Sequence, residues 1–335
     1  MDPKATGDLT SLAASFPLVV YDHGEQPDNS HTMLSVVDGS SHTCRIPELQ
    51  NSTCLETPCG LVLVADNTTP SQCSLWNPQT GEKISLPALD AAPPENSRCL
   101  LSDTVSSPDC LVLINDTTGF SFMFCHVRGG TAWTTQPYDI GLYALPPGSL
   151  SAPAKMEIDN LAAVQGKFYF MENLDEVWVL SFAQDPEPHL EMTSFDALMP
   201  TFVSVSDEPQ LVIDTYLLES SQELFLVCVY MPGCDFEHIE EVSAYKMDFS
   251  KQEWCKVTDI GDRAFLLGPR SFAASCAAGE HGLKRGCVYY AFDFFRDTNE
   301  FYIFDLMEGT REVTGPGQDV PLSARQPFWM VPVCP

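Results

Sequence analysis

Positive charge is scarce in this sequence. Its 17 Lys and Arg residues stand against 46 Asp and Glu residues, which gives a formal net charge of −29. A surface with this excess of carboxylates repels phosphate backbones and anionic lipid headgroups. We therefore expect no binding to nucleic acid and none to a membrane. The excess charge keeps the protein soluble, or it complements a protein partner that carries basic patches.

Long apolar runs and closely spaced cysteine pairs are also missing. No stretch of 18 apolar residues occurs, so we expect no transmembrane helix. The N-terminus carries Asp2 and Asp8 and lacks the basic start of a secretory signal. The 13 cysteines form no Cys-x-x-Cys motif and lie mainly in apolar stretches, where a free thiol acts as a small apolar group. These features predict a reduced protein of the cytoplasm or nucleus.

Sequence signatures of common catalytic sites are absent as well. The chain has no Gly-x-Ser-x-Gly nucleophile elbow, no phosphate-binding Gly-x-x-x-x-Gly-Lys-Ser/Thr loop, no His-Glu-x-x-His and no Gly-x-Gly-x-x-Gly. Its seven histidines lack metal-ligand spacing: His23, His31, His42, His126, His189, His238 and His281. We predict no catalytic residues, no cofactor and no metal site, and hence a protein that is not an enzyme.

One polar cluster, at residues 235–241, is dense enough to consider as a site. It contains Asp235, Glu237, His238, Glu240 and Glu241. Carboxylates and an imidazole could bind a divalent cation, but a calcium loop needs a glycine at its sharp turn and ligands at fixed spacing. The cluster follows Pro232-Gly233, so a solvated loop between strands is the simpler interpretation. Such a loop on a rigid scaffold is our candidate for contact with a basic partner.

Recurring aromatic and acidic residues allow one enzymatic alternative. Some all-β enzymes hydrolyse sugars with two carboxylates across a central pocket, and 46 acidic residues supply many such pairs by chance. Trp76, Trp133, Trp178 and Trp254 recur about once per repeat. Packing between repeats explains that regularity better than a sugar-stacking platform does. A carbohydrate-active enzyme is therefore a further alternative only.

The sequence is dominated by a repeated pattern of short apolar strands. The clearest copy joins residues 60–64 to residues 75–87, where Asn77-Pro78 and Thr80-Gly81 supply the turn of a hairpin. Turn markers recur at spacings of 39, 50, 55, 66 and 57 residues, at Asp38, Asn77, Val127, Phe182, Asp248 and Asp305. One four-stranded propeller blade uses about 40–50 residues.

This pattern predicts an all-β protein with a single, kelch-like β-propeller. We expect six blades, with seven as the alternative, and two stacked β-sandwiches as the rival architecture. Residues 17–21 and 329–333 are short apolar strands at the two ends, and their pairing would close the ring. The expected organisation is a short N-terminal tail at 1–15 and a propeller domain at 16–335, acting as a monomer.

An ordered set of motifs carries a family resemblance. These are residues 59–64, 75–78 and 81–87, Trp254 with Val257, then 261–268, 286–290, 304–306 with Gly309, and 329–332. The chain resembles the plant F-box-associated β-propeller proteins, which include kink-suppressor-type F-box proteins, from about Phe16 onward. Many members carry an N-terminal F-box that docks on a Skp-type adaptor, while the propeller presents a substrate for ubiquitylation.

The resemblance implies a protein-interaction role, but this sequence departs from the family pattern at its start. Only the residues before Phe16 precede the first predicted strand, too few for an F-box. We therefore expect a non-enzymatic propeller that binds a protein partner through its blade loops. The alternative is the substrate-recognition component of an SCF-type ubiquitin ligase, reached without an F-box.

Overall fold

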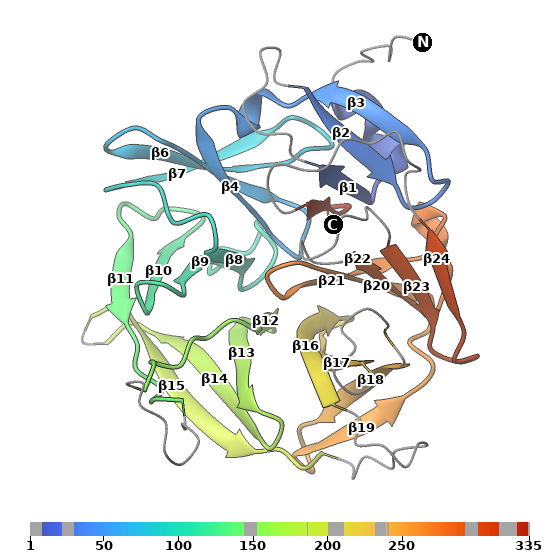
Figure 1. Cartoon of the computed structure of the whole chain (residues 1–335). Helices are drawn as coiled ribbons and strands as arrows, with labels where there is room; N and C mark the ends of the chain where they lie inside the picture. The colour runs from blue at the N-terminus through green and yellow to red at the C-terminus, as the bar shows by residue number, and fades with distance from the viewer. Residues whose placement is uncertain are drawn as a thin grey trace.

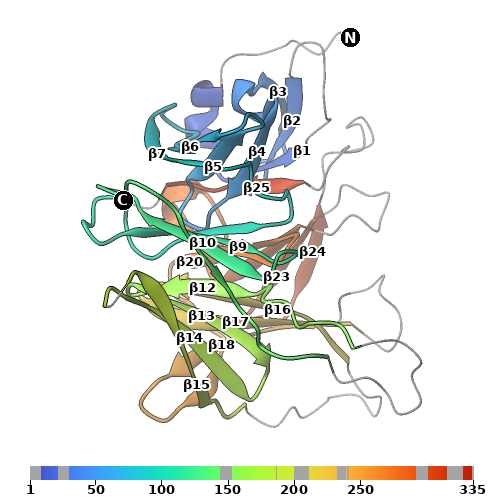
Figure 2. The ribbon, with the colours of Figure 1, turned by 90° about the vertical axis from the view of Figure 1, so that its left-hand side faces the viewer.

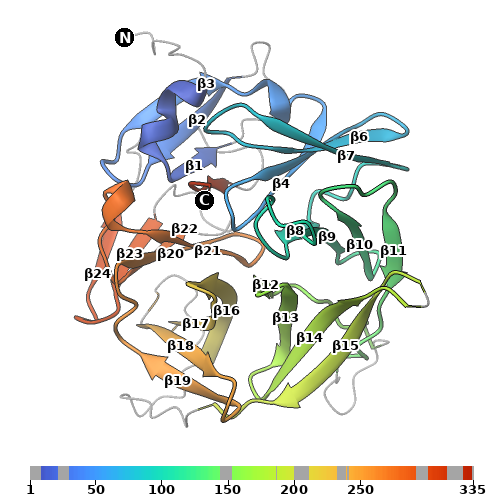
Figure 3. The same ribbon diagram turned by 180° about the vertical axis from the view of Figure 1, so that it is seen from behind.

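The chain forms a ring of six β-sheets around a central axis (Figure 1). The computed structural model describes residues 9–21, 30–143, 153–185, 187–199, 211–231, 239, 241–291, 301–314 and 327–333. Five sheets have four strands and one has five. This is a six-bladed β-propeller, as the repeat pattern predicted, and two stacked sandwiches are excluded. The same ring is seen from behind in Figure 3.

Each blade is a sheet that runs from an inner strand at the axis to an outer strand at the rim (Figure 1). Blade 1 comprises β25 (Phe328–Met330), β1 (Leu18–Tyr21), β2 (Ser30–Ser35) and β3 (Ser41–Arg45). Blade 2 comprises β4 (Ser52–Glu56), β5 (Val62–Asp66), β6 (Ser71–Trp76) and β7 (Lys83–Leu89). Blade 3 comprises β8 (Arg98–Leu101), β9 (Leu111–Asp116), β10 (Ser121–His126) and β11 (Thr134–Pro137).

The other half of the ring follows the same plan until its last blade. Blade 4 comprises β12 (Leu161–Val164), β13 (Lys167–Asn173), β14 (Glu176–Ala183) and β15 (His189–Asp196). Blade 5 comprises β16 (Leu211–Ser220), β17 (Glu223–Met231), β18 (Glu241–Asp248) and β19 (Glu253–Val257). Blade 6 has five strands, in the order β21 (Phe272–Ala277), β20 (Arg263–Gly268), β22 (Cys287–Ala291), β23 (Phe301–Asp305) and β24 (Arg311–Thr314).

Blade 6 departs from the antiparallel pattern of the others. Its β20–β21 hairpin places β21 at the axis, and β20 then pairs in parallel with β22, with Ala264 opposite Cys287. A parallel pair needs a crossover connection, and residues 278–286, which include the short helix η3 (Gly279–His281), provide it.

Five of the six predicted turn markers lie at hairpins, either between the third and fourth strands of a regular blade or between β23 and β24. Four of them are built alike, since Oδ1 of an Asp or Asn accepts a hydrogen bond from the amide two residues on. These bonds run from Ser40 to Asp38 (3.0 Å), Gln79 to Asn77 (2.9 Å), Ser250 to Asp248 (3.0 Å) and Met307 to Asp305 (2.9 Å). Phe182 lies within β14 rather than in the turn after it.

The chain ends close the ring as predicted. β25 pairs antiparallel with β1, with Leu18 opposite Met330 and Val20 opposite Phe328. Figure 2 shows β25 beside β1 with the ring seen from its edge. The Trp329 side chain is 1% exposed, and its Nε1 donates a 2.9 Å hydrogen bond to the Leu267 carbonyl of blade 6. The first helix, η1 (Leu9–Ser15), packs against this region through buried Leu9.

The hydrophobic core is divided into six clusters, one at each junction between neighbouring blades. The tryptophans that recur in the sequence belong to these junctions. Trp76 is buried between blades 1 and 2 and Trp254 between blades 4 and 5, while Trp133 and Trp178 pack against two further clusters. The interpretation of these residues as packing residues is confirmed.

Most cysteines of the described chain are buried. Burial raises the pKa of the thiols of Cys73 and Cys125 to about 12 and that of Cys287 to about 11. These side chains therefore stay protonated at neutral pH and pack as small apolar groups. Among the described residues, no helix has the length and apolar character that crossing a bilayer requires.

Gly60 is required because the segment that closes the ring, residues 328–333, passes close to blade 2 at this position. We call residues 328–333 the closing segment. The φ of Gly60 is +88°, and a Cβ at this position would lie 2.5 Å from the Pro332 carbonyl oxygen. Gly39 offers a matched comparison, because its φ is +69° but a Cβ there would meet nothing within 4 Å.

We predict that Gly60→Ala destabilises the protein more than Gly39→Ala does. Both substitutions add the left-handed backbone penalty of about 1–2 kcal/mol. Only Gly60→Ala also forces the closing segment away, which adds about 1–3 kcal/mol. Urea unfolding of the two variants beside the wild type measures the difference. Equal losses would contradict the role of Gly60 in ring closure.

Candidate functional site

An open cavity of about 510 Å³ lies at the centre of the ring. Its lining comes mainly from the ends of the inner strands β8, β12 and β16 and from the turns that follow them, with β21 and Val333 completing it. The cavity therefore opens on the side of the ring where these strands end, which we call the pocket face. Because successive strands of a blade alternate in direction, the Asp and Asn hairpin turns lie on this face too.

The floor of the cavity is apolar and lined by small or branched side chains. β8 contributes Leu100 and Leu101, β12 contributes Ala162 and Ala163, and β16 contributes Leu217 and Leu218. The described lining includes no aromatic side chain. A sugar-stacking platform formed by the recurring tryptophans is therefore not found at this cavity.

Two carboxylates and two amides stand at the rim. Asp103 follows β8, and its Oδ1 accepts a 2.7 Å hydrogen bond from the Thr104 amide. Glu219 is near the end of β16, and its Oε1 accepts a 2.5 Å bond from the amide of Gln222. Gln165 then joins blade 4 to blade 5 by donating from Nε2 to the Gln222 carbonyl at 3.0 Å. These bonds fix the turns that surround the cavity mouth.

Arg98 anchors a layer of polar side chains beneath the floor. It begins β8, and its guanidinium donates to the Asp159 carbonyl before blade 4 and, at 2.6 Å, to the Ser271 carbonyl of blade 6. Only 8% of Arg98 is exposed. Burial lowers its pKa to about 10, so it remains charged at neutral pH. Both of its acceptors are backbone groups, which gives the charge partners without a buried ion pair.

A second arginine cross-links blades 6 and 2 in the same layer. Nη2 of Arg270 lies 2.9 and 3.0 Å from the two carboxylate oxygens of Glu56, and Nη1 donates to the Glu95 carbonyl at 2.9 Å. The Glu56 carboxylate raises the pKa of Arg270. A space of only about 10 Å³ remains among Glu56, Arg98 and Arg270. These three side chains are thus closely packed in the layer beneath the floor.

Asp214 is a carboxyl group of blade 5 with a strongly shifted pKa. Burial raises its pKa to about 6, although the Tyr216 hydroxyl donates a 2.6 Å hydrogen bond to its Oδ2. The hydroxyl of Tyr290, from blade 6, lies 3.4 Å from that of Tyr216. The hydrogen bonds among Asp214, Tyr216 and Tyr290 join blades 5 and 6, but they leave the charge of the Asp214 carboxylate poorly solvated.

The loop predicted as a contact site lies almost entirely outside the described residues. This holds for Asp235, Glu237, His238 and Glu240. Glu241 begins β18, where it accepts a 2.6 Å bond from Ser243 and pairs with Lys256 at 3.1 Å. Partial burial opposes ionisation of Glu241, but these two partners hold its pKa below the usual value. Its carboxylate is engaged within blade 5, and the role of this loop as a contact site stays a prediction.

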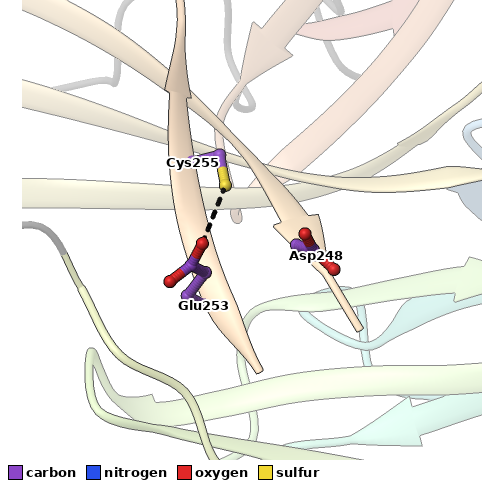
Figure 4. A group of neighbouring side chains, drawn as sticks. All are labelled: Asp248, Glu253 and Cys255. Atoms are coloured by element: carbon purple, nitrogen blue, oxygen red, sulfur yellow. Dashed lines mark hydrogen bonds between the residues drawn. The ribbon is translucent and has the colours of Figure 1, made fainter. Parts of the chain in front are cut away.

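One group of potential metal ligands occurs in the described chain, at the outer edge of blade 5. Figure 4 shows Glu253 and Cys255 on β19 facing Asp248 at the end of β18. The Nζ of Lys251 lies 3.3 Å from Asp248 and 3.1 Å from Glu253. This ammonium group neutralises the two carboxylates, and the arrangement is that of a surface ion-pair network.

The rim residues Asp103, Gln165 and Glu219 were not singled out from the sequence. Their position in the repeat is a signal that sequence reasoning could have used. Asp103 and Gln165 follow the first apolar strand of their repeats, and Glu219 lies near the end of such a strand. That position can be recognised only when the inner strand of every blade is known.

We predict that Asp214→Asn stabilises the protein at neutral pH and reduces its pH dependence. A carboxyl whose pKa is about 6 when folded and about 3.9 when unfolded contributes stability that is lost as the pH rises from about 4 to 6. The full loss is on the order of 2–3 kcal/mol. The asparagine side chain would still accept the Tyr216 bond without a charge.

The measurement is the free energy of unfolding of wild type and variant between pH 4 and 8. The variant's advantage should grow up to about pH 6 and then stay constant. Asp90→Asn, at an exposed position, is the control. An advantage that does not change with pH would show that the buried charge of Asp214 is not its cause.

Among solved structures, the chain is similar to several at low identity. One is a putative 6-phosphogluconolactonase from Bacteroides uniformis, with 12% identity, a TM-score of 0.42 and coverage of 95% of this chain and 98% of that one. Another is BBS1N in its complex with ARL6DN, with 8% identity, a TM-score of 0.37 and coverage of 92% and 77%. Likeness at this level carries no argument about function.

Sequence comparison is more specific. A putative F-box protein of Arabidopsis thaliana is 23% identical over 210 residues, which cover 62% of this chain and 48% of that protein. The chain thus spans about half the length of the curated relative that it matches. The sequence model of the KIB1-4 β-propeller matches residues 33–312, from blade 1 to the outer strand of blade 6. The chain therefore belongs to the KIB1-4 β-propeller family, a group of plant F-box-associated propellers.

Proposed function

We propose that this chain is a non-enzymatic protein-interaction propeller that holds a partner protein on its pocket face. The observation that carries the proposal is the open cavity of about 510 Å³ with an apolar floor and fixed turns around its mouth. Concave, mostly apolar sites with a few placed polar groups are where proteins bind other molecules. The blades hold these turns rigidly, so binding loses little entropy in ordering them.

The chemistry of the cavity supports binding rather than catalysis. Its described lining contains the carboxylates of Asp103 and Glu219 and the thiol of Cys59, with no histidine or lysine beside them. A nucleophile with an adjacent base, or an acid and base around a sugar-binding surface, would need further partners. A cytoplasmic or nuclear location goes with this proposal, supported by the free thiols of the described chain.

A second candidate function is substrate recognition within an SCF-type ubiquitin ligase. The match to a putative F-box protein favours it. In that case the pocket face would hold the protein to be ubiquitylated, and contact with the ligase would come from elsewhere. Both candidate functions require a partner protein on the pocket face. They differ in whether a ubiquitin ligase is bound as well.

We predict that a partner retained by the immobilised chain depends on the cavity. Ala163→Phe places an aromatic ring where a partly buried alanine lines the cavity. Ser194→Phe, on the exposed outer strand β15, is the matched control. Mass spectrometry of proteins captured from a plant cell extract should show at least one protein that both wild type and Ser194→Phe retain and that Ala163→Phe reduces at least fivefold. Thermal unfolding confirms that each variant is folded.

Two further readouts complete this experiment. Cross-links to the retained protein should start from Lys167, which is exposed and begins β13 beside the cavity. A Skp-type adaptor and a cullin in amounts close to the bait would favour the ligase candidate. Identical protein sets from wild type and folded Ala163→Phe would contradict binding at the pocket face.

A further inference from the structure

We propose that the central cavity receives a short segment of the partner in which an apolar side chain is flanked by lysine or arginine. This inference rests on the proposed function and names the chemistry that the pocket face recognises. It follows from three properties of the described cavity: an apolar floor, an acidic rim, and the placement of the two rim carboxylates on separate blades.

The floor selects an apolar anchor. Leu100 and Leu217 are each 1% exposed and form closely packed walls, whereas Ala163 is only partly buried and leaves room above it. A volume of about 510 Å³ lies within the range of sites that enclose small ligands, about 300–1,000 Å³. An inserted side chain would release water from the partly buried apolar groups of the lining, such as Ala163 and Val105, and such release is the main driving force for apolar contacts. Because the cavity opens among the turns that follow the inner strands, the anchor enters from the pocket face.

The rim selects positive charge on either side of that anchor. The described lining has the carboxylates of Asp103 and Glu219 and no cationic side chain. Two neighbouring arginines are tied to the protein, since Arg263 Nε donates to Ser275 at 2.9 Å and Arg128 Nε donates to the Val105 carbonyl at 3.0 Å. Lys167, an exposed cation at the β12–β13 turn, lies beside the cavity but outside its lining. With a formal net charge of −29, the whole chain adds to the attraction of a basic segment.

The positions of the carboxylates favour a peptide segment over a single small cation. Asp103 belongs to blade 3 and Glu219 to blade 5, with the β12–β13 turn of blade 4 between them. The two carboxylates thus come from blades that are not neighbours in the ring. A segment with a cation before and after its apolar residue places each charge at one carboxylate. An RNA or DNA segment would bring its phosphates to the same carboxylates and be repelled.

The first test is selection from a random peptide library displayed on phage, with the whole chain as target. We expect enriched peptides to carry Lys or Arg within about three residues on each side of a Leu, Met, Phe or similar residue. Selection on Ala163→Phe should not enrich this pattern. A library that yields no binder, or binders without the cation bias, would overturn the inference.

The second test measures a selected, fluorescein-labelled peptide by fluorescence anisotropy against rim variants. Asp103→Asn with Glu219→Gln keeps the amide-accepting oxygens and removes both charges, so the fold is preserved. Each exposed ion pair accounts for about two- to fivefold in affinity, and the double variant should bind about 4- to 25-fold more weakly, with less salt dependence. Asp185→Asn with Glu187→Gln, at exposed positions of the β14–β15 turn, is the matched control and should bind as the wild type does.

Unchanged affinity in the rim variant would overturn the role of charge, even if Ala163→Phe abolishes binding. Competition separates this inference from the proposed function. Excess selected peptide should displace the captured partner from the wild-type chain. If a cavity-dependent partner is captured but the peptide does not displace it, the proposed function stands and the inference about the segment fails.

Discussion

The ring depends on one constraint: both faces of every blade must be buried by a neighbour. Strand β17 shows how the sequence meets it, because successive residues point to opposite faces of a sheet. Leu224, Leu226 and Cys228 belong to the cluster shared with blade 4, while Phe225 and Val227 belong to the one shared with blade 6. An open arc of blades would leave two complete apolar faces in water, so closure of the ring is part of the hydrophobic core rather than an addition to it.

Closure of the ring explains why several residues occupy their positions, which their neighbours in sequence do not explain. β25 adds the inner strand of blade 1 from the other end of the chain, and Trp329 fills the junction with blade 6. A Cβ on Gly268 would lie 2.7 Å from the Trp329 ring, and one on Gly60 would strike the backbone just beyond it. The two glycines lie more than 200 positions apart in sequence, yet both make room for the same closing segment.

Features set by short-range sequence were predictable, whereas contacts between distant segments were not, apart from the pairing of β1 with β25. Asp38, Asn77, Asp248 and Asp305 mark hairpins because their side chains bond to an amide two residues on, which a single stretch of sequence reveals. The β20–β21 hairpin of blade 6, whose second strand lies at the axis, was not predicted from the sequence, because its turn uses Arg270 and Ser271 at positive φ instead of glycine. Arg98, Arg270 and the cavity rim were missed because their partners come from other blades.

The central channel is filled differently at two levels. At one level, Arg98 and Arg270 reach across the axis and satisfy carbonyl and carboxylate groups of other blades, which leaves almost no space between them. At the next level, Ala162, Ala163 and Ala273 are too small to meet across the axis, and a cavity remains. A ring whose blades were held only by apolar junctions could fill both levels with larger side chains. The apolar residues of the open level pack into the blade junctions, as Leu100 and Leu217 do, and the acidic rim above them is the feature on which the proposed binding of a partner rests.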